Sequence, residues 1–467
     1  KIASDGSLST PTLGTDNVHL GENAGNSIAS GGVRNVLIGK DAGTAITTGD
    51  YNIAIGYNAL KTEDTGSAST ALGYYALATQ NLDALSFNTA VGFTAGELIT
   101  TGTNNTLIGS YAGDALTDAD YNVAVGSGAL TADTLGSKSV AIGYHALDEQ
   151  NFTSATDAYN VAVGFDAGQK VTTGTLNTLI GGLSGDAITT GVANVIVGYQ
   201  AGSSLTDADD NVAMGKEALR DDTKGSKSVA IGKSALQAQN FTSATDTYNT
   251  AVGYQAGKAV TTGVQNTLIG GLAGDAITTA NNNTALGFNS LGLNTTGNSN
   301  VAIGYATLDA NTTASNNTAV GTSALTANTT GFDNVAVGAT ALDANTTGNG
   351  NTAVGYGSLG SDTLGDRAVA IGKNALTAQN FTSSTDNYNV AIGYSAGSSI
   401  TTGTPNTLIG GLAGDALTTG GSNVAIGYNS LSTEDAHGGN VAVGTNALTT
   451  QNAGATGYNT AVGHNAG

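Results

Sequence analysis

Apolar and polar residues alternate over a five-residue segment that recurs along almost the whole chain. The segment Asn300-Val301-Ala302-Ile303-Gly304 is one copy, and 26 copies run from Asn17 to Gly463. In every copy, Val, Ile or Thr stands three residues before the closing glycine, and Val, Ile, Leu or Met stands one residue before it. Aliphatic and β-branched residues at alternating positions predict a short β-strand and not a helix.

The spacing of these copies predicts a solenoid. Of the 25 intervals between closing glycines, 19 are 17 residues long, and the others are 18, 19 or 21 residues long. A fixed period of this kind indicates stacked repeats in which each repeat contacts only its neighbours. We therefore predict an all-β, parallel β-solenoid of 26 short turns over residues 17–467. Residues 1–16 carry no copy and are predicted to form a lead-in or cap segment.

Asparagine and glycine bound each predicted strand. Asn stands four residues before the closing glycine in 22 copies, and Ser69, Ser139, Ser228 and Ala368 are its substitutes. A stacked Asn tolerates the left-handed backbone of a corner and hydrogen-bonds its equivalents in adjacent turns. The glycine is expected at the next corner, where no Cβ fits. The predicted structural ladders include Asn300, Ala302, Ile303, Gly304, Asn317, Gly321, Asn334 and Gly338.

The middle of each predicted strand is usually small. It is Ala in most copies, Leu or Ile in the others, and His19 once. We expect Val301 and Ile303 to fill the interior of the coil and Ala302 to face outward. The outward residues would then form a continuous apolar stripe, larger than the patches that soluble monomers expose. A symmetric homo-oligomer, in which the same stripe of each copy is covered, is therefore predicted.

The second half of each repeat shows a compensation in side-chain volume. Where Leu60 stands four residues after the glycine, the polar Glu63 stands seven after it; where Gly43 takes the first position, Ile46 takes the second. A constant total volume is what a close-packed interior requires.

Five copies carry extra residues at one location, which predicts loops on one face of the coil. The insertions follow Gln80, Gln150, Gln239, Gln379 and Gln451. On the three nearly identical insertions, the aromatic residues Phe152, Phe241 and Phe381 are candidates for contacting a receptor. Other aromatic residues directly follow the repeat glycine: Tyr57, Tyr74, Phe93, Tyr144, Phe165, Tyr199, Tyr254 and Tyr305. Stacking between turns or subunit packing is the favoured interpretation of these residues, and sugar binding is the alternative.

Composition excludes several classes of function. A net charge of −21 with only 14 basic residues argues against nucleic-acid or anionic-membrane partners. No apolar run approaches the roughly 18 residues of a membrane span, so no direct membrane insertion is expected. There is no cysteine, and His19, His145, His437 and His464 are scattered.

Neither catalytic residues nor a cofactor nor a metal site is therefore predicted. Asp114, Asp186, Asp275 and Asp415 share one repeat position but are several turns apart, so no acid/base pair is expected. Asp207, Asp209 and Asp210 are interpreted as a solvated turn, with a calcium site as the alternative.

The segment Lys138-Ser139-Val140-Ala141-Ile142-Gly143 resembles the YadA-like head repeats of trimeric autotransporter adhesins. That resemblance implies a left-handed β-roll intertwined as a homotrimer, although the period of 17 is longer than in those heads. The longer segment Asn351-Thr352-Ala353-Val354-Gly355-Tyr356-Gly357-Ser358-Leu359 is similar to repeat shafts of bacteriophage and other viral tail fibres. Such shafts often precede a self-cleaving chaperone.

The expected function is therefore a non-enzymatic, extracellular shaft of a viral tail fibre or receptor-binding appendage on the virion surface. Its partners would be itself, as a homotrimer, a host-surface glycan or protein, and other virion or cell-surface proteins at both ends. A bacterial surface adhesin or extracellular filament is the alternative. Adjacent threonines over five successive turns, from Thr278-Thr279 to Thr346-Thr347, also raise ice binding as a remote alternative.

Overall fold

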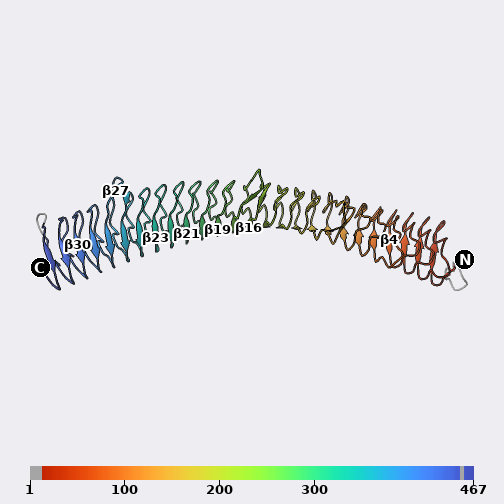
Figure 1. The fold of residues 1–467 in the computed structure, drawn as a ribbon, viewed down its shortest axis with the longest axis horizontal. Coiled ribbons are helices and arrows are strands. Elements are labelled where there is room, and N and C mark those ends of the chain that lie inside the picture. The colour runs from red at the N-terminus through yellow and green to blue at the C-terminus, as the bar shows by residue number, and fades with distance from the viewer. Residues whose placement is uncertain (1–12, 453–456) are drawn as a thin grey trace. The chain divides into compact units, whose positions relative to one another are not determined.

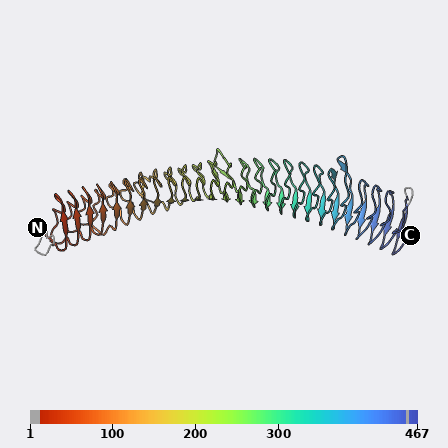
Figure 2. The same cartoon turned by 180° about the vertical axis from the view of Figure 1, so that it is seen from behind.

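The computed structural model describes residues 13–452 and 457–467, and these residues form an all-β protein without a helix. Most of the predicted lead-in segment, residues 1–12, lies outside the described residues. The chain divides into two compact units, one of residues 1–228 with 240–246 and one of residues 229–239 with 247–467. Each unit is a parallel β-solenoid, with its strands side by side and its loops on the other side of the coil (Figures 1 and 2).

Each of the 26 predicted copies forms a three-residue strand, as expected. In the first unit the strands are β1 (Val18–Leu20), β2 (Val36–Ile38), β3 (Ile53–Ile55), β4 (Thr70–Leu72), β5 (Thr89–Val91), β6 (Thr106–Ile108), β7 (Val123–Val125), β9 (Val140–Ile142), β11 (Val161–Val163), β12 (Thr178–Ile180), β13 (Val195–Val197) and β14 (Val212–Met214). In the second unit they are β16 (Val229–Ile231), β18 (Thr250–Val252), β19 (Thr267–Ile269), β20 (Thr284–Leu286), β21 (Val301–Ile303), β22 (Thr318–Val320), β23 (Val335–Val337), β24 (Thr352–Val354), β26 (Val369–Ile371), β28 (Val390–Ile392), β29 (Thr407–Ile409), β30 (Val424–Ile426), β31 (Val441–Val443) and β32 (Thr460–Val462).

Equivalent residues of successive turns stack in columns. Strand β21 pairs with β22 in parallel, with Ala302 opposite Ala319 and Ile303 opposite Val320. The same register recurs from turn to turn in both units, so the period of 17 residues is confirmed as the length of one turn.

The strand faces are the reverse of the prediction. Ala302 is fully buried within a single chain, whereas Val301 and Ile303 are half-buried and lie on the outward face. The interior is narrow because the second half of the turn also sends a large side chain into it. All six turns with Leu or Ile at the middle strand position have Gly four residues after the closing glycine. At one such turn, a Cβ on Gly43 would lie 2.8 Å from Leu37 Cδ2.

The predicted volume compensation is confirmed. Leu60 and Ile46, which occupy the two alternative positions, are both fully buried. Leu60 enters the interior from a left-handed backbone conformation with φ of 51°, and Gly43 has nearly the same φ of 55° in its own turn. The backbone therefore follows the same path in both kinds of turn, and only the position that supplies the buried side chain differs.

The asparagine ladder is present, but the left-handed corner lies one residue earlier than predicted. Ser299, with φ of 58°, takes the left-handed conformation, and Asn300 does not. The Asn300 backbone N–H donates to Asn283 Oδ1 at 2.9 Å, and Asn300 Oδ1 accepts from the Asn317 N–H at 3.0 Å. Asn300 Nδ2 donates to the Ala314 carbonyl at 2.8 Å. These bonds make the buried amide a link between turns.

We expect Asn300→Ala to lower the free energy of unfolding by about 1.5 to 4.5 kcal/mol. The substitution leaves the buried Asn317 N–H without its acceptor, which costs about 1–3 kcal/mol, and it removes one of two hydrogen bonds to the Ala314 carbonyl, worth about 0.5–1.5 kcal/mol. The carbonyl keeps the bond from Asn311 Nδ2 at 3.0 Å. Denaturant unfolding measures the change. The exposed neighbour Asn298 provides a control, because Asn298→Ala removes a surface side chain whose loss should cost under about 1 kcal/mol.

Three of the inserted loops add a small parallel pairing to the preceding turn. The pairs are β8 (Gly136–Ser137) with β10 (Thr156–Asp157), β15 (Gly225–Ser226) with β17 (Thr245–Asp246), and β25 (Gly365–Asp366) with β27 (Thr385–Asp386). In the second unit, β27 lies on the loop side of the coil, away from the main strands (Figure 1). The predicted placement of this insertion in a loop is confirmed.

Candidate functional surfaces

The three receptor-contact candidates are not on the surface. Phe152, Phe241 and Phe381 are only 5%, 7% and 5% exposed. Each ring packs beneath its own loop, and a Cβ on Gly136 would lie 2.7 Å from Phe152 Cδ2. These three apolar rings therefore close the interior of the coil beneath the inserted residues, and their contact with a receptor stays a prediction.

A buried polar network anchors each inserted loop. Gln150 Nε2 donates to Asp133 Oδ2 at 2.6 Å and to Ser139 Oγ at 3.0 Å. Asn160 Nδ2 donates to Gln150 Oε1 at 2.8 Å, and the Phe152 backbone N–H donates to Asp133 Oδ1 at 3.3 Å. Burial raises the pKa of the Asp133 carboxyl, and the hydrogen bond from Gln150 offsets part of that rise.

The same arrangement accompanies every insertion. An acidic residue precedes each insertion Gln by 17 residues: Glu63, Asp133, Asp222, Asp362 and Glu434. All five acids are fully buried. The four substitutes for the ladder Asn (Ser69, Ser139, Ser228 and Ala368) each precede one of the first four insertion Gln residues by 11 residues. In the sequence these residues lie far apart, and the signal that joins them is their shared spacing.

The outward faces of the strands form a second surface. Val335 and Val337 of β23 are 36% and 37% exposed. In preceding turns, Ile303, Leu286 and Ile269 lie in the column of Val337. The other outward position is Val, Thr or Ile in every turn. A continuous stripe of β-branched and aliphatic side chains therefore lies along each unit, larger than a scattering of single surface residues.

The aromatic residues that follow the repeat glycine form short exposed stacks. The Tyr57 and Tyr74 rings stack with centroids 5.4 Å apart, and the Tyr74 and Phe93 rings stack at 5.0 Å. Tyr144 stacks on Phe165 at 5.4 Å. These contacts confirm stacking between turns, and all of these rings remain at least 40% exposed.

A second set of exposed aromatic residues lies beside the inserted loops. Tyr159 and Tyr388 precede ladder asparagines and are 49% and 54% exposed. Lys138 lies over the Tyr159 ring at 5.1 Å and forms an ion pair with Asp157 at 2.6 Å. Arg367 lies over the Tyr388 ring at 5.8 Å and pairs with Asp386. The loops therefore present a tyrosine with a charged pair on the surface.

The first threonine of each adjacent pair has a structural role. Thr278 Oγ1 donates to the Thr295 carbonyl at 3.1 Å, and the next four turns repeat this bond, through Thr295, Thr312, Thr329 and Thr346. The first hydroxyl of each pair is therefore committed to the coil, and only the second is exposed.

The carboxylates of Asp207, Asp209 and Asp210 do not come together around a common point. Asp209 Oδ1 accepts the Val192 N–H at 2.7 Å, Asp207 forms an ion pair with Lys224 at 3.5 Å, and Asp210 is exposed. Elsewhere, burial raises the pKa of Asp114 to about 6, and it also raises the pKa values of Asp186, Asp275 and Asp415, which lie in separate turns.

The histidines have separate environments. His145 Nδ1 lies 2.9 Å from Asp148, and burial lowers the pKa of His19 within the first turn. His464 is exposed. His437 Nδ1 lies 3.1 Å from Glu434.

The fold and its surfaces define a parallel β-solenoid repeat protein. No family model and no curated protein matches the chain. The described residues include no helix with the length and apolar character that crossing a membrane demands.

Proposed function

We propose that this protein is a trimeric, extracellular shaft that supports attachment to a host surface, as part of a viral tail fibre or comparable receptor-binding appendage. The single observation that carries this proposal is the outward stripe of Val, Ile and Thr on the main strands. Water-exposed apolar stripes of this extent are characteristic of surfaces that a partner covers. Three copies around a common axis cover identical stripes with identical contacts.

Because the strand faces are the reverse of the prediction, the residues of the proposed interface also differ from those predicted. Val335 and Val337, and not Ala336, meet the neighbouring copies. Host contact is assigned to the exposed Tyr159 and Tyr388 beside the inserted loops, because Phe152 and Phe381 are buried. Aromatic faces with a polar tip suit sugar rings or protein surfaces.

Light scattering coupled to size-exclusion chromatography tests the assembly. We expect the mass of three chains, and we expect Val335→Asp with Val337→Asp to shift the population toward smaller species, because two carboxylates would be desolvated in each interface. The control is Thr313→Asp with Thr330→Asp, which adds the same charge at exposed turn positions. A monomeric wild-type protein contradicts the proposal, as does equal dissociation of both double variants.

A bacterial surface adhesin or extracellular filament shares the same solenoid resemblance. The full-length open reading frame distinguishes the two: a downstream self-cleaving chaperone supports the fibre, and a downstream membrane anchor supports the adhesin.

A further inference from the structure

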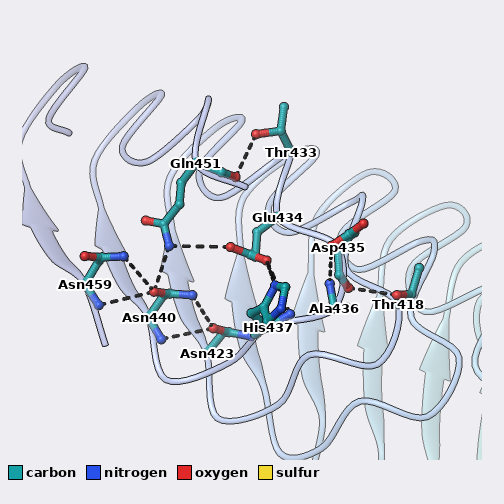
Figure 3. A network of polar contacts seen from close by, with 10 residues as sticks. All are labelled: Thr418, Asn423, Thr433, Glu434, Asp435, Ala436, His437, Asn440, Gln451 and Asn459. Carbon is teal, nitrogen blue, oxygen red and sulfur yellow. Dashed lines mark hydrogen bonds and ion pairs between the residues drawn. The ribbon is translucent and has the colours of Figure 1, made fainter. Parts of the chain in front are cut away.

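Glu434, Asp435 and His437 lie together in the loop that precedes β31 (Figure 3). One donor atom from each lies within 4.8 Å of the others, and within the described part of the chain no other three such side chains come together in this way. Glu434 is fully buried, His437 is partly buried, and Asp435 is exposed. We propose that these three residues bind a single Zn²⁺ ion at the surface of the second unit.

His437 replaces a small residue that the other turns keep. Of the 19 turns of 17 residues, 18 have Gly or Ala ten residues after the closing glycine, and the remaining turn has His437. Space at this position is limited. In the turn where Glu63 takes the place of Glu434, a Cβ on Gly66 would lie 2.4 Å from Glu63 Oε1. His437 therefore brings an imidazole against a carboxylate at a position that holds at most a methyl group in the other turns of 17 residues.

Two hydrogen bonds to the carboxylate of Glu434 are longer than the equivalent bonds to Glu63. Glu63 accepts the Gly66 N–H and Gln80 Nε2, both at 2.8 Å. The corresponding bonds to Glu434, from the His437 N–H and from Gln451 Nε2, measure 3.3 and 3.4 Å. His437 Nδ1 lies 3.1 Å from Glu434 Oε1.

The donor set matches zinc. One imidazole nitrogen and two carboxylate oxygens are ligands that Zn²⁺ accepts at about 2.0–2.2 Å, whereas Ca²⁺ selects oxygen alone. Two ligands of a tetrahedral ion at those distances lie roughly 3.3 Å apart, close to the observed separation of Nδ1 and Oε1. Asp435 is exposed and accepts the Ala436 N–H through Oδ1 at 2.6 Å; its carboxylate would supply the third ligand, and a water molecule would complete the tetrahedron.

Two further features favour a bound cation. Gln451 Nε2 donates to Glu434 Oε2 at 3.4 Å and to Asn440 Oδ1 at 3.0 Å, so it orients the carboxylate as an outer-shell partner does. The sequence after Lys373 contains no Lys or Arg and four acidic residues, Asp386, Asp415, Glu434 and Asp435. The local charge is therefore negative, and a metal ion binding there meets no fixed positive charge.

Isothermal titration of ZnCl₂ into the untagged, metal-free full chain tests the proposal. We expect one tight equivalent per chain, and we expect His437→Gly to weaken its affinity at least about tenfold. This variant restores the residue that most turns carry and is expected to fold. Co²⁺ in place of Zn²⁺ should give visible absorption bands of a tetrahedral site in the wild type that disappear in His437→Gly.

The control is His145→Gly, which removes another histidine beside a carboxylate and introduces the glycine that Gly128 provides in the preceding turn. It should retain full affinity. The proposal is overturned if the wild type binds no tight equivalent, if His437→Gly binds as tightly as the wild type, or if both variants lose affinity to the same extent.

Discussion

Gly304→Ala is expected to lower the free energy of unfolding by about 2 to 6 kcal/mol, the sum of backbone strain and overpacking. Gly304 has φ of 137°, a conformation that a residue with a side chain rarely adopts. An added Cβ would lie 2.6 Å from the Gly321 carbonyl oxygen of the next turn, and the backbone there cannot move without breaking the strand register. Hydrogen exchange over residues 287–338 should show faster opening of these turns, together with a lower denaturation midpoint.

The matched control is Gly271→Ala in the same unit. No positive φ restricts Gly271, and an added Cβ would make only an ordinary contact, 3.4 Å from the Phe288 ring. This substitution should change stability by less than about 1 kcal/mol. Similar losses in both variants would contradict a specific requirement for glycine at the strand end.

Gln150→Leu is expected to cost about 3–5 kcal/mol at neutral pH, because it leaves the Asp133 carboxylate buried without its strongest donor. Burial already raises the pKa of Asp133 in the folded protein. Because the pKa of the Asp133 carboxyl is higher in the folded than in the unfolded protein, this group contributes stability at pH values below its unfolded pKa. That contribution is lost as the pH rises through its folded pKa. The penalty should therefore shrink when unfolding is measured at about pH 5 in place of about pH 7.5.

Asp133→Asn should rescue Gln150→Leu at neutral pH. The chain already has asparagine at this position in other turns, where Asn294 Oδ1 accepts the Gly297 N–H at 3.2 Å. The neutral amide keeps the backbone hydrogen bond and removes the buried charge. A double variant as unstable as Gln150→Leu, with the same dependence on pH, would falsify the assignment of the penalty to the buried carboxylate.

The fold followed from the sequence because both of its determinants are local. The alternation in Val301-Ala302-Ile303 defines a strand, and the fixed spacing of Gly304 and Gly321 requires that strands stack. The alternation alone does not say which face points inward. Ala302 suggested close approach of another chain, but the interior is the narrower place, since Leu, Ile or Val from the second half of each turn already occupies it.

The candidate surfaces were less predictable because they depend on contacts between turns. Phe152 follows a Gln-Asn pair in an inserted segment, which is typical of a surface loop. Its burial depends on Asp133, 19 residues earlier, whose carboxylate accepts the Phe152 N–H and fixes the loop against the coil. Likewise, His437 becomes a neighbour of Glu434 only because their turn closes tightly, and the sequence alone showed an isolated histidine.

The asparagine ladder has a consequence for the gene. From Asn283 to Asn351, each buried amide makes the same bonds to the turn on either side, at 2.7–3.1 Å. A turn removed from this stretch, or copied within it, leaves the flanking turns with partners identical to those they had before. Unequal recombination in steps of 17 codons can therefore lengthen or shorten the protein while every junction stays native. The length of the protein can therefore evolve separately from its surface chemistry.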